Sequence, residues 1–196
     1  MSFNAKVVGN QIVIYDTKIA NDLYSTGWYG ELSDDGHLIL EPYEAVLLME
    51  RKRIIVVNEL DKELSLPELI SYFSKVFPGF LVYYLLFKDL RGRGYVVKKY
   101  EKTHNFFTLY ERGASPNKEK ETKYALIVPF VEGVMFNIDQ IEKIVSRADN
   151  MGLSLIFAVI DSLGDVNYYS VKSLEFPIIK KEKEDDKNES PVWCRK

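Results

Sequence analysis

The sequence has little of what many catalytic and metal-binding sites are made from. Its 196 residues include one cysteine, Cys194, and two histidines, His37 and His104. A single cysteine excludes a disulfide framework and a cysteine-based metal site, and it fits a reducing compartment. The N-terminus carries no signal-peptide pattern, and no apolar run approaches the roughly 18 residues of a membrane helix. We therefore expect a soluble, cytoplasmic protein with no membrane association.

A general excess of positive charge is also missing, because the formal net charge is -3. This excludes a uniformly basic nucleic-acid coat protein, since non-specific phosphate binding depends on concentrated Lys and Arg. One segment differs from the rest: residues 88–123 hold ten Lys or Arg against five Asp or Glu, a local charge of +5. Hydrophobic residues make up 46% of the chain and aromatic residues 13%, enough for a packed core. The sequence thus predicts a globular protein with one basic region.

The first part of the chain, residues 1–77, is predicted to be a small α/β domain. Gly9 and Asn10 separate two short strand patterns, 5–8 and 11–14, as in a hairpin. A helix at 18–25 precedes an expected aromatic strand at 28–31, and a second helix begins at Pro42 before a buried strand at 54–57. Ser65 and Glu68 have capping-box spacing, which predicts a helix over 66–76.

Pro78 and Gly79 break the pattern, and residues 78–178 are predicted to form a second domain with a mixed sheet and flanking helices. A mostly apolar helix is expected over 80–91, and strands over 95–98, 106–111 and 124–131. Asn137 should cap the next helix, followed by strands over 153–160 and 166–174. The fold class is therefore α/β (α+β). Residues 179–196 are almost wholly charged and polar, so we expect disorder there.

The strands at 95–98 and 106–111 enclose a polar loop that carries His104, and the second strand includes Tyr110. A tyrosine beside a basic loop can act as a catalytic group or face RNA. Ordinary packing of an aromatic residue in a sheet is the alternative, and the local pattern leaves both open.

The chain resembles the archaeal tRNA-splicing endonucleases, which remove introns from precursor tRNA. The resemblance rests on LYSTGWYG at 23–30 and LEPYEAVLLMER at 40–51, then on DLRGRGYVVK at 89–98, LYERG at 109–113, TKYALIV at 122–128 and AVIDSLGDVNYY at 158–169. It implies two domains and a metal-free, cofactor-free cleavage at bulge-helix-bulge sites that leaves 2′,3′-cyclic phosphate and 5′-hydroxyl ends. In the family, a tyrosine accepts the 2′-hydroxyl proton, a histidine protonates the leaving oxygen and a lysine stabilises the phosphate charge.

Only one of these three groups is present at its expected position. Tyr110 matches the tyrosine, whereas Glu121 stands at the histidine position and Leu153 or Ser154 at the lysine position. Ionised Glu121 repels phosphate and is more simply a solvated surface charge. His104 is the alternative acid, although its spacing differs from the family's, and a lone loop histidine is usually a surface residue. The resemblance therefore implies a non-catalytic subunit in which Tyr110 is vestigial.

The same resemblance implies a heterotetramer of two such chains with two related catalytic chains, acting on precursor tRNA. Asp161 and Asp165 lie where the family has an acidic loop that enters a basic cleft of a neighbour, and Tyr168, Tyr169 and Val171 belong to the expected pairing strand. An ordinary hairpin turn and an ordinary core strand are the alternatives.

The candidates for contact with RNA phosphates are all basic, and a solvated basic face is the alternative explanation. They are Arg91, Arg93, Lys98, Lys99, Lys102 and Arg112, together with Arg147, which lies near a base-stacking arginine of the family. Three functions remain open at this point: a structural endonuclease subunit, an active enzyme using Tyr110 and His104, and a free-standing RNA-binding module.

Overall fold

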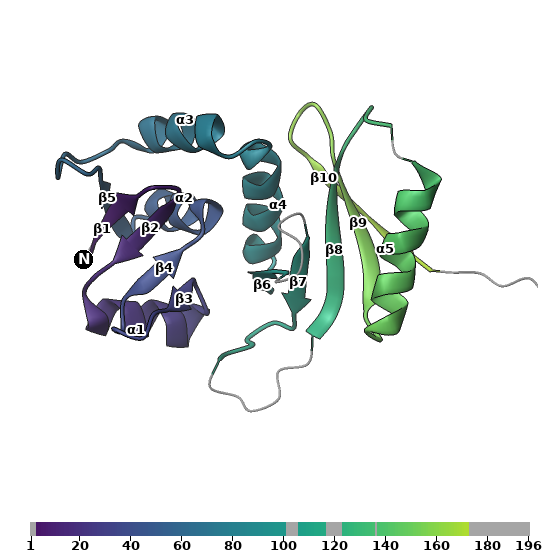
Figure 1. Cartoon of the computed structure of the whole chain (residues 1–196), viewed down its shortest axis with the longest axis horizontal. Coiled ribbons are helices and arrows are strands. Elements are labelled where there is room, and N and C mark those ends of the chain that lie inside the picture. Colours follow the sequence, from purple (N-terminus) through teal and green to yellow (C-terminus); the bar gives the residue numbers. More distant parts are fainter. Residues whose placement is uncertain (1–2, 101–105, 117–122, 136, 173–196) are drawn as a thin grey trace, which may run out of the picture.

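A computed structural model describes residues 3–100, 106–116, 123–135 and 137–172. These residues form two five-stranded sheets, an N-terminal one and a C-terminal one, with helices packed on both (Figure 1). Both sheets contain parallel and antiparallel pairs, which confirms the predicted α/β class. Within the described residues, no helix is long and apolar enough to cross a membrane.

The N-terminal sheet has the strand order β3-β4-β2-β1-β5. Its strands are β1 (Phe3–Val8), β2 (Gln11–Ile14), β3 (Glu31–Leu32), β4 (Leu38–Leu40) and β5 (Ile54–Val57). Its helices are α1 (Thr17–Gly27), α2 (Pro42–Glu50) and α3 (Leu66–Val76). The predicted hairpin is confirmed, because β1 and β2 pair antiparallel around Gly9, whose φ of 56° suits glycine. Ser65 and Glu68 form the predicted capping box of α3.

The prediction of an aromatic strand over 28–31 is wrong. Helix α1 continues to Gly27, and Trp28 ends it in the left-handed conformation, with φ 48°. Gly30 is also left-handed, with φ 61°, so the chain turns sharply and the strand begins only at Glu31. The aromatic residues favoured an extended strand, but two left-handed residues so close together are incompatible with one.

The C-terminal sheet has the order β10-β9-β8-β7-β6. Its strands are β6 (Val96–Lys99), β7 (Phe107–Tyr110), β8 (Lys123–Val131), β9 (Ser154–Ile160) and β10 (Val166–Val171). Helix α5 (Ile138–Asn150) joins the parallel strands β8 and β9, and Asn137 caps it by accepting a hydrogen bond from the backbone N–H of Asp139 at 3.0 Å. That cap confirms the prediction made for Asn137.

Helix α4 (Phe80–Gly92) stands between the two sheets (Figure 1) and contacts both α2 and the strands of the C-terminal sheet. Aromatic rings join the two halves: Tyr43 of α2 lies 4.9 Å from Phe87 of α4 and 5.2 Å from Phe107 of β7, measured between ring centroids. One hydrophobic core therefore extends through both domains. The domain boundary at residues 77 and 78 stays a prediction, and residues 173–196, including the tail predicted to be disordered, lie outside the described part.

Candidate active-site pocket and interaction surfaces

Tyr110 lies at the end of β7, where the register with β8 shifts between Leu109 and Tyr110. It faces the N-terminal domain, and its ring lies 4.8 Å from the Trp28 indole with an interplanar angle of 47°. These rings line an interdomain pocket of about 400 Å³, called the Tyr110 pocket below. Its lining comes from α1 and β3 on one side and from β6, β7 and β8 on the other, with Met151 after α5.

The described lining of the Tyr110 pocket is mainly aromatic and basic, with one acid, Glu31. It contains Tyr24, Trp28, Tyr100 and Tyr110 together with Lys98, Lys99 and Lys123. No histidine occurs among these described lining residues. Two of the lysines are held by the N-terminal domain: Lys98 Nζ donates to the Gly30 carbonyl at 2.6 Å, and Lys99 Nζ lies 2.9 Å from Glu41 Oε1. Lys123 is exposed.

The positions expected to carry the acid and the lysine give two different outcomes. Glu121 and His104 lie outside the described residues, so their predicted roles stay predictions. Leu153 is half-buried and Ser154 is exposed at the start of β9. The pocket residue from this part of the chain is Met151, whose Sδ lies 3.3 Å from the Tyr100 hydroxyl. The thioether is neutral and cannot supply the positive charge of a lysine. His37 packs edge-to-face against Tyr15 at 5.0 Å in the N-terminal domain.

Arg91 and Lys98, two of the predicted RNA contacts, bind the main chain of the N-terminal domain. Arg91 donates to the Gly27 carbonyl at 2.6 Å, and its guanidinium lies 4.1 Å from the centre of the Tyr29 ring. Such a cation-π contact stabilises the guanidinium where it lies. These two side chains, like that of Lys99, therefore join the domains of one chain, and their RNA contacts stay predictions.

The other described arginine candidates are not among the residues that line the Tyr110 pocket. Arg93 pairs with Asp89 at 2.7 Å, and Arg112 lies 5.1 Å from the Tyr95 ring centre. The Asp89 carboxylate raises the pKa of the Arg93 guanidinium. Arg147 is exposed on α5, in an open groove that it shares with Lys143 and acidic residues of the same helix. Lys102 lies outside the described residues. Contact of these four side chains with RNA is untested by the structure.

The loop between β9 and β10 is built around Asp161. Its Oδ1 accepts hydrogen bonds from the backbone N–H groups of Leu163 and Asp165, both at 2.9 Å. Asp161 is half-buried, whereas Asp165 is exposed and Leu163 is 86% exposed. The carboxylate of Asp161 thus shapes the loop, and the side chains of Leu163 and Asp165 are available at its tip.

Strand β10 is an edge strand, paired with β9 alone within the described residues. Its side chains alternate: Tyr168 points to α4 and donates from its hydroxyl to Asp89 Oδ2 at 2.6 Å, whereas Tyr169 is 57% exposed. Burial, together with the Asp89 hydrogen bond, raises the pKa of Tyr168. Val171 is half-buried. Tyr168 therefore holds β10 on the domain core, and Tyr169 is on the accessible face.

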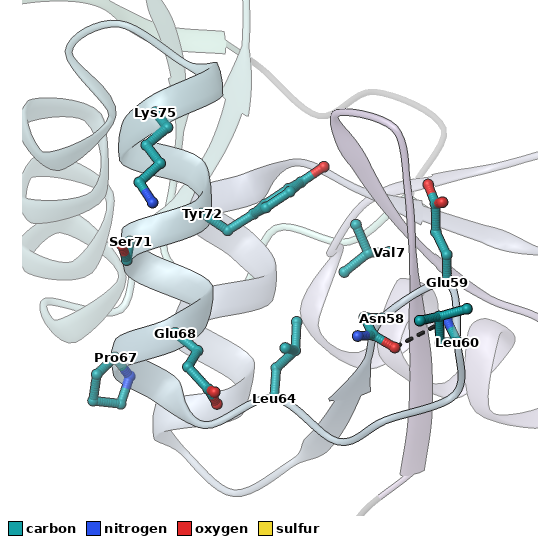
Figure 2. Close-up of a pocket in the computed structure, with 10 residues that line it drawn as sticks. All are labelled: Val7, Asn58, Glu59, Leu60, Leu64, Pro67, Glu68, Ser71, Tyr72 and Lys75. Carbon is teal, nitrogen blue, oxygen red and sulfur yellow. Dashed lines mark hydrogen bonds between the residues drawn. The ribbon is translucent and has the colours of Figure 1, made fainter.

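A further groove, which the sequence did not indicate, lies at the far end of the N-terminal domain. Figure 2 shows its lining from α3, from Val7 and from the loop after β5. Its volume is about 750 Å³, and Leu60, 87% exposed, stands at its rim. The Asn58 side chain accepts from the Leu60 N–H at 2.9 Å, which fixes this loop. Across the described residues, no group of acidic, histidine or cysteine side chains is arranged to hold a metal ion.

Both halves of the chain match models of one protein family. Residues 3–70 match the tRNA intron endonuclease, N-terminal domain, and residues 80–168 match the tRNA intron endonuclease, catalytic C-terminal domain. The chain belongs to the tRNA intron endonuclease family. A tRNA-splicing endonuclease of Thermococcus onnurineus is 34% identical over 171 residues, which cover 87% of this chain and 96% of that protein. One from Methanococcus vannielii is 33% identical over 171 residues, covering 87% and 94%.

Membership in the tRNA intron endonuclease family places the chain in tRNA splicing and tRNA processing. The expected resemblance is thereby confirmed at the level of the family. Sequence reasoning missed two features of the joint between the domains: the indole of Trp28 beside Tyr110, and the buried carboxylate of Glu44 near Lys98. The signal for Glu44 was an acidic residue inside the apolar pattern of α2, where seven of nine residues are buried. An acid in such a position needs a polar partner from elsewhere in the chain.

Proposed function

We propose that this chain is the non-catalytic structural subunit of a tRNA-splicing endonuclease, in which two copies assemble with two copies of a related catalytic chain. The complex cleaves precursor tRNA at bulge-helix-bulge sites, leaving 2′,3′-cyclic phosphate and 5′-hydroxyl ends. The catalytic chain supplies the complete active site. This chain supplies docking surfaces and the architecture of the complex.

The observation that carries the proposal is the composition of the Tyr110 pocket. Tyr110 is present, but the described lining offers no histidine, and Met151 is the pocket residue contributed by the segment before β9. The family position for lysine is occupied by Leu153 or Ser154. A tyrosine therefore lies in the pocket without a lysine from the β9 side.

The chemistry explains why Tyr110 alone is insufficient. When a ribose 2′-hydroxyl attacks the adjacent phosphate, one group must accept its proton and another must protonate the 5′-oxygen that leaves. A cation must also offset the negative charge that builds on the phosphate oxygens. Lys98 does not fill the last role, because its ammonium donates to the Gly30 carbonyl and its side chain is 15% exposed.

Two features of the β9–β10 end support a role in assembly. Asp161 fixes a loop whose tip presents Leu163 and the carboxylate of Asp165. Tyr169 projects from the accessible face of an edge strand, and the outer edge of such a strand can pair with a further strand. A charged loop tip directs association with an oppositely charged cleft.

Cleavage by the separate and combined chains tests the proposal. The partner is the related chain of the same organism that has a histidine where this chain has Glu121 and a lysine where it has Leu153 or Ser154. A bulge-helix-bulge precursor tRNA should remain intact with this chain alone and be cut when both chains are mixed. Cleavage by this purified chain alone, abolished by His104→Ala, would instead establish it as an active enzyme.

Binding separates the proposal from the remaining alternative. A free-standing RNA-binding module would bind the precursor tRNA without a partner, with an affinity that falls steeply as salt increases. The proposal predicts tight binding only in the assembled complex. Filter binding of each chain and of the mixture over a salt series distinguishes the two.

A further inference from the structure

Glu44 is the one charged residue among the described residues whose side chain is fully enclosed, with the residue only 2% exposed. It lies on α2 and faces the joint between the domains. Its carboxylate accepts hydrogen bonds from the Gly30 N–H at 3.0 and 3.1 Å and from the Glu41 N–H at 3.0 Å. Burying a carboxylate costs free energy unless such donors surround it. The N–H groups of Gly30 and Glu41 therefore explain why an acid can occupy this position.

Lys98 approaches the same glycine from the C-terminal domain. Its ammonium donates to the Gly30 carbonyl at 2.6 Å and lies 3.5 Å from the Trp28 carbonyl oxygen. It is 3.9 Å from Glu44 Oε1. Gly30 is therefore bound through its N–H by Glu44 and through its carbonyl by Lys98.

Arg91 adds an independent contact to this segment. Its guanidinium donates to the Gly27 carbonyl at 2.6 Å, so two cations of the C-terminal domain hold three carbonyl oxygens within residues 27–30. The segment needs such support at Trp28, because a positive φ is unfavourable for a residue other than glycine. A side chain at position 30 is also excluded, since a Cβ there would lie 2.5 Å from the Ile39 carbonyl oxygen.

This geometry determines the position of the Trp28 side chain. The turn places the Trp28 indole 4.8 Å from the Tyr110 ring, across the joint between the domains. We propose that Glu44 and Lys98 form an interdomain clamp on Gly30 that sets the Trp28 indole against Tyr110 and so fixes the shape of the Tyr110 pocket. Lys98 is then a positioning residue that acts through the Trp28–Gly30 main chain, and it does not contact RNA phosphate.

Tryptophan fluorescence offers a direct readout of the interdomain clamp. The chain has two tryptophans, so Trp193→Phe leaves Trp28 as the only one. In that background, Lys98→Met combined with Glu44→Gln removes the cation without leaving a buried unpaired carboxylate, and the glutamine side chain can still accept from the Gly30 N–H. The clamp predicts a red-shifted Trp28 emission and stronger acrylamide quenching, with an unchanged far-ultraviolet circular dichroism spectrum.

Two matched variants distinguish the clamp from a general loss of charge. Lys123→Met removes an exposed lysine that lines the same pocket and should leave the Trp28 signal unchanged. Lys98→Arg, with Glu44 intact, keeps the positive charge and N–H donors for the two carbonyls and should preserve the native signal. An unchanged Trp28 signal in the Lys98→Met, Glu44→Gln variant would overturn the proposal, as would an equal change in Lys123→Met.

Hydrogen exchange tests the clamp without any substitution. In the unaltered chain the Gly30 amide should exchange as slowly as core amides such as that of Ile12, because its N–H donates to Glu44 and its carbonyl is held by Lys98, so exchange requires this segment to open. Rapid exchange of Gly30 beside a protected Ile12 would show local opening of the segment and overturn the proposal. This measurement needs no substitution, so it can overturn the proposal even if the double variant does not fold.

Discussion

The two ends of the C-terminal sheet use their polar side chains in opposite ways. At the β6–β7 end, Lys98 and Lys99 bind groups of the N-terminal domain at 2.6 and 2.9 Å. At the β9–β10 end, Leu163, Asp165 and Tyr169 extend outward from a loop and an edge strand. Lys98 and Lys99 therefore hold one chain together, whereas the charge at the β9–β10 end remains available to another molecule.

The comparison of the two sheet ends distinguishes residues that serve the structure of this chain from residues that can serve its function. The surroundings of Tyr110 resemble a nuclease site in sequence, but two lysines of its pocket, Lys98 and Lys99, make contacts between the domains. In the proposed non-catalytic role the chain still needs those contacts, because they join its two domains. If the comparison is correct, substitutions at the β6–β7 end should affect folding, and substitutions at the β9–β10 end should affect assembly.

Loss of the clamp lysine should have the largest effect on folding. Lys98→Met leaves Glu44, which is fully buried, without its nearest cation. Breaking a buried pair by removing one partner costs about 3 to 5 kcal/mol, so we expect a fall of that order in the free energy of unfolding. Urea denaturation measures it. Lys123→Met, an exposed control, should change stability by less than about 0.5 kcal/mol.

Reversal of the loop charge should mainly weaken assembly. Asp165→Lys places a cation at the exposed loop tip, where docking into a basic cleft requires an anion. We expect the Kd for the catalytic partner to rise at least about tenfold, which corresponds to roughly 1.4 kcal/mol. Sedimentation of the mixed chains measures it. Glu59→Lys, a matched reversal at an exposed site of the N-terminal domain, should leave the Kd unchanged, and equal weakening by both would remove the loop's assigned role.

A change of pH should distinguish Glu44 from an ordinary surface acid. Burial raises the pKa of Glu44, and this outweighs the opposing effects of Lys98 and of the backbone hydrogen bonds from Gly30 and Glu41, while the nearby Glu41 carboxylate also raises it. A raised carboxyl pKa means that the folded chain binds this proton more tightly than the unfolded chain. That stabilising contribution is complete below the ordinary pKa of 4.5 and is lost as pH rises through the raised value.

Unfolding of the unaltered chain and of Glu44→Gln should be compared over this range. The unaltered chain should gain stability relative to Glu44→Gln as pH falls from 7 toward 4.5, since the glutamine carries no titrating proton. A stability difference that does not vary with pH would show that Glu44 has an ordinary pKa in the folded chain.

Substitutions at the two neighbouring tyrosines of β10 should have different effects, one on folding and the other on assembly. Tyr168→Phe removes the 2.6 Å hydrogen bond to Asp89 and should cost about 1 kcal/mol of folding stability, with no change in assembly. Tyr169→Asp, on the exposed face, should weaken assembly and leave folding stability unchanged. Thermal unfolding and sedimentation of both variants give the two readouts. Weakened assembly in Tyr168→Phe alone would assign the interface to the other face.

Local features of the sequence predicted much of the fold. Asn137, the Ser65 and Glu68 pair and Gly9 act within a few residues of themselves, so their caps and turns were evident without tertiary structure. The turn at Trp28 was missed because a left-handed tryptophan is uncommon, and because the contact of its carbonyl with Lys98 spans 70 residues. Likewise, a local charge count over residues 88–123 could not show that Lys99 is paired with Glu41, 58 residues earlier.

The central claim is that Tyr110 no longer takes part in catalysis. It is tested most directly by the rate at which the complex of both chains cleaves a bulge-helix-bulge precursor tRNA when this chain carries Tyr110→Phe. The substitution removes the hydroxyl and keeps the ring that packs against Trp28, and sedimentation of the mixed chains checks that assembly is unchanged. We predict an unchanged rate. Loss of a working proton acceptor would slow cleavage by about 10²- to 10⁴-fold, and such a loss here would contradict the account.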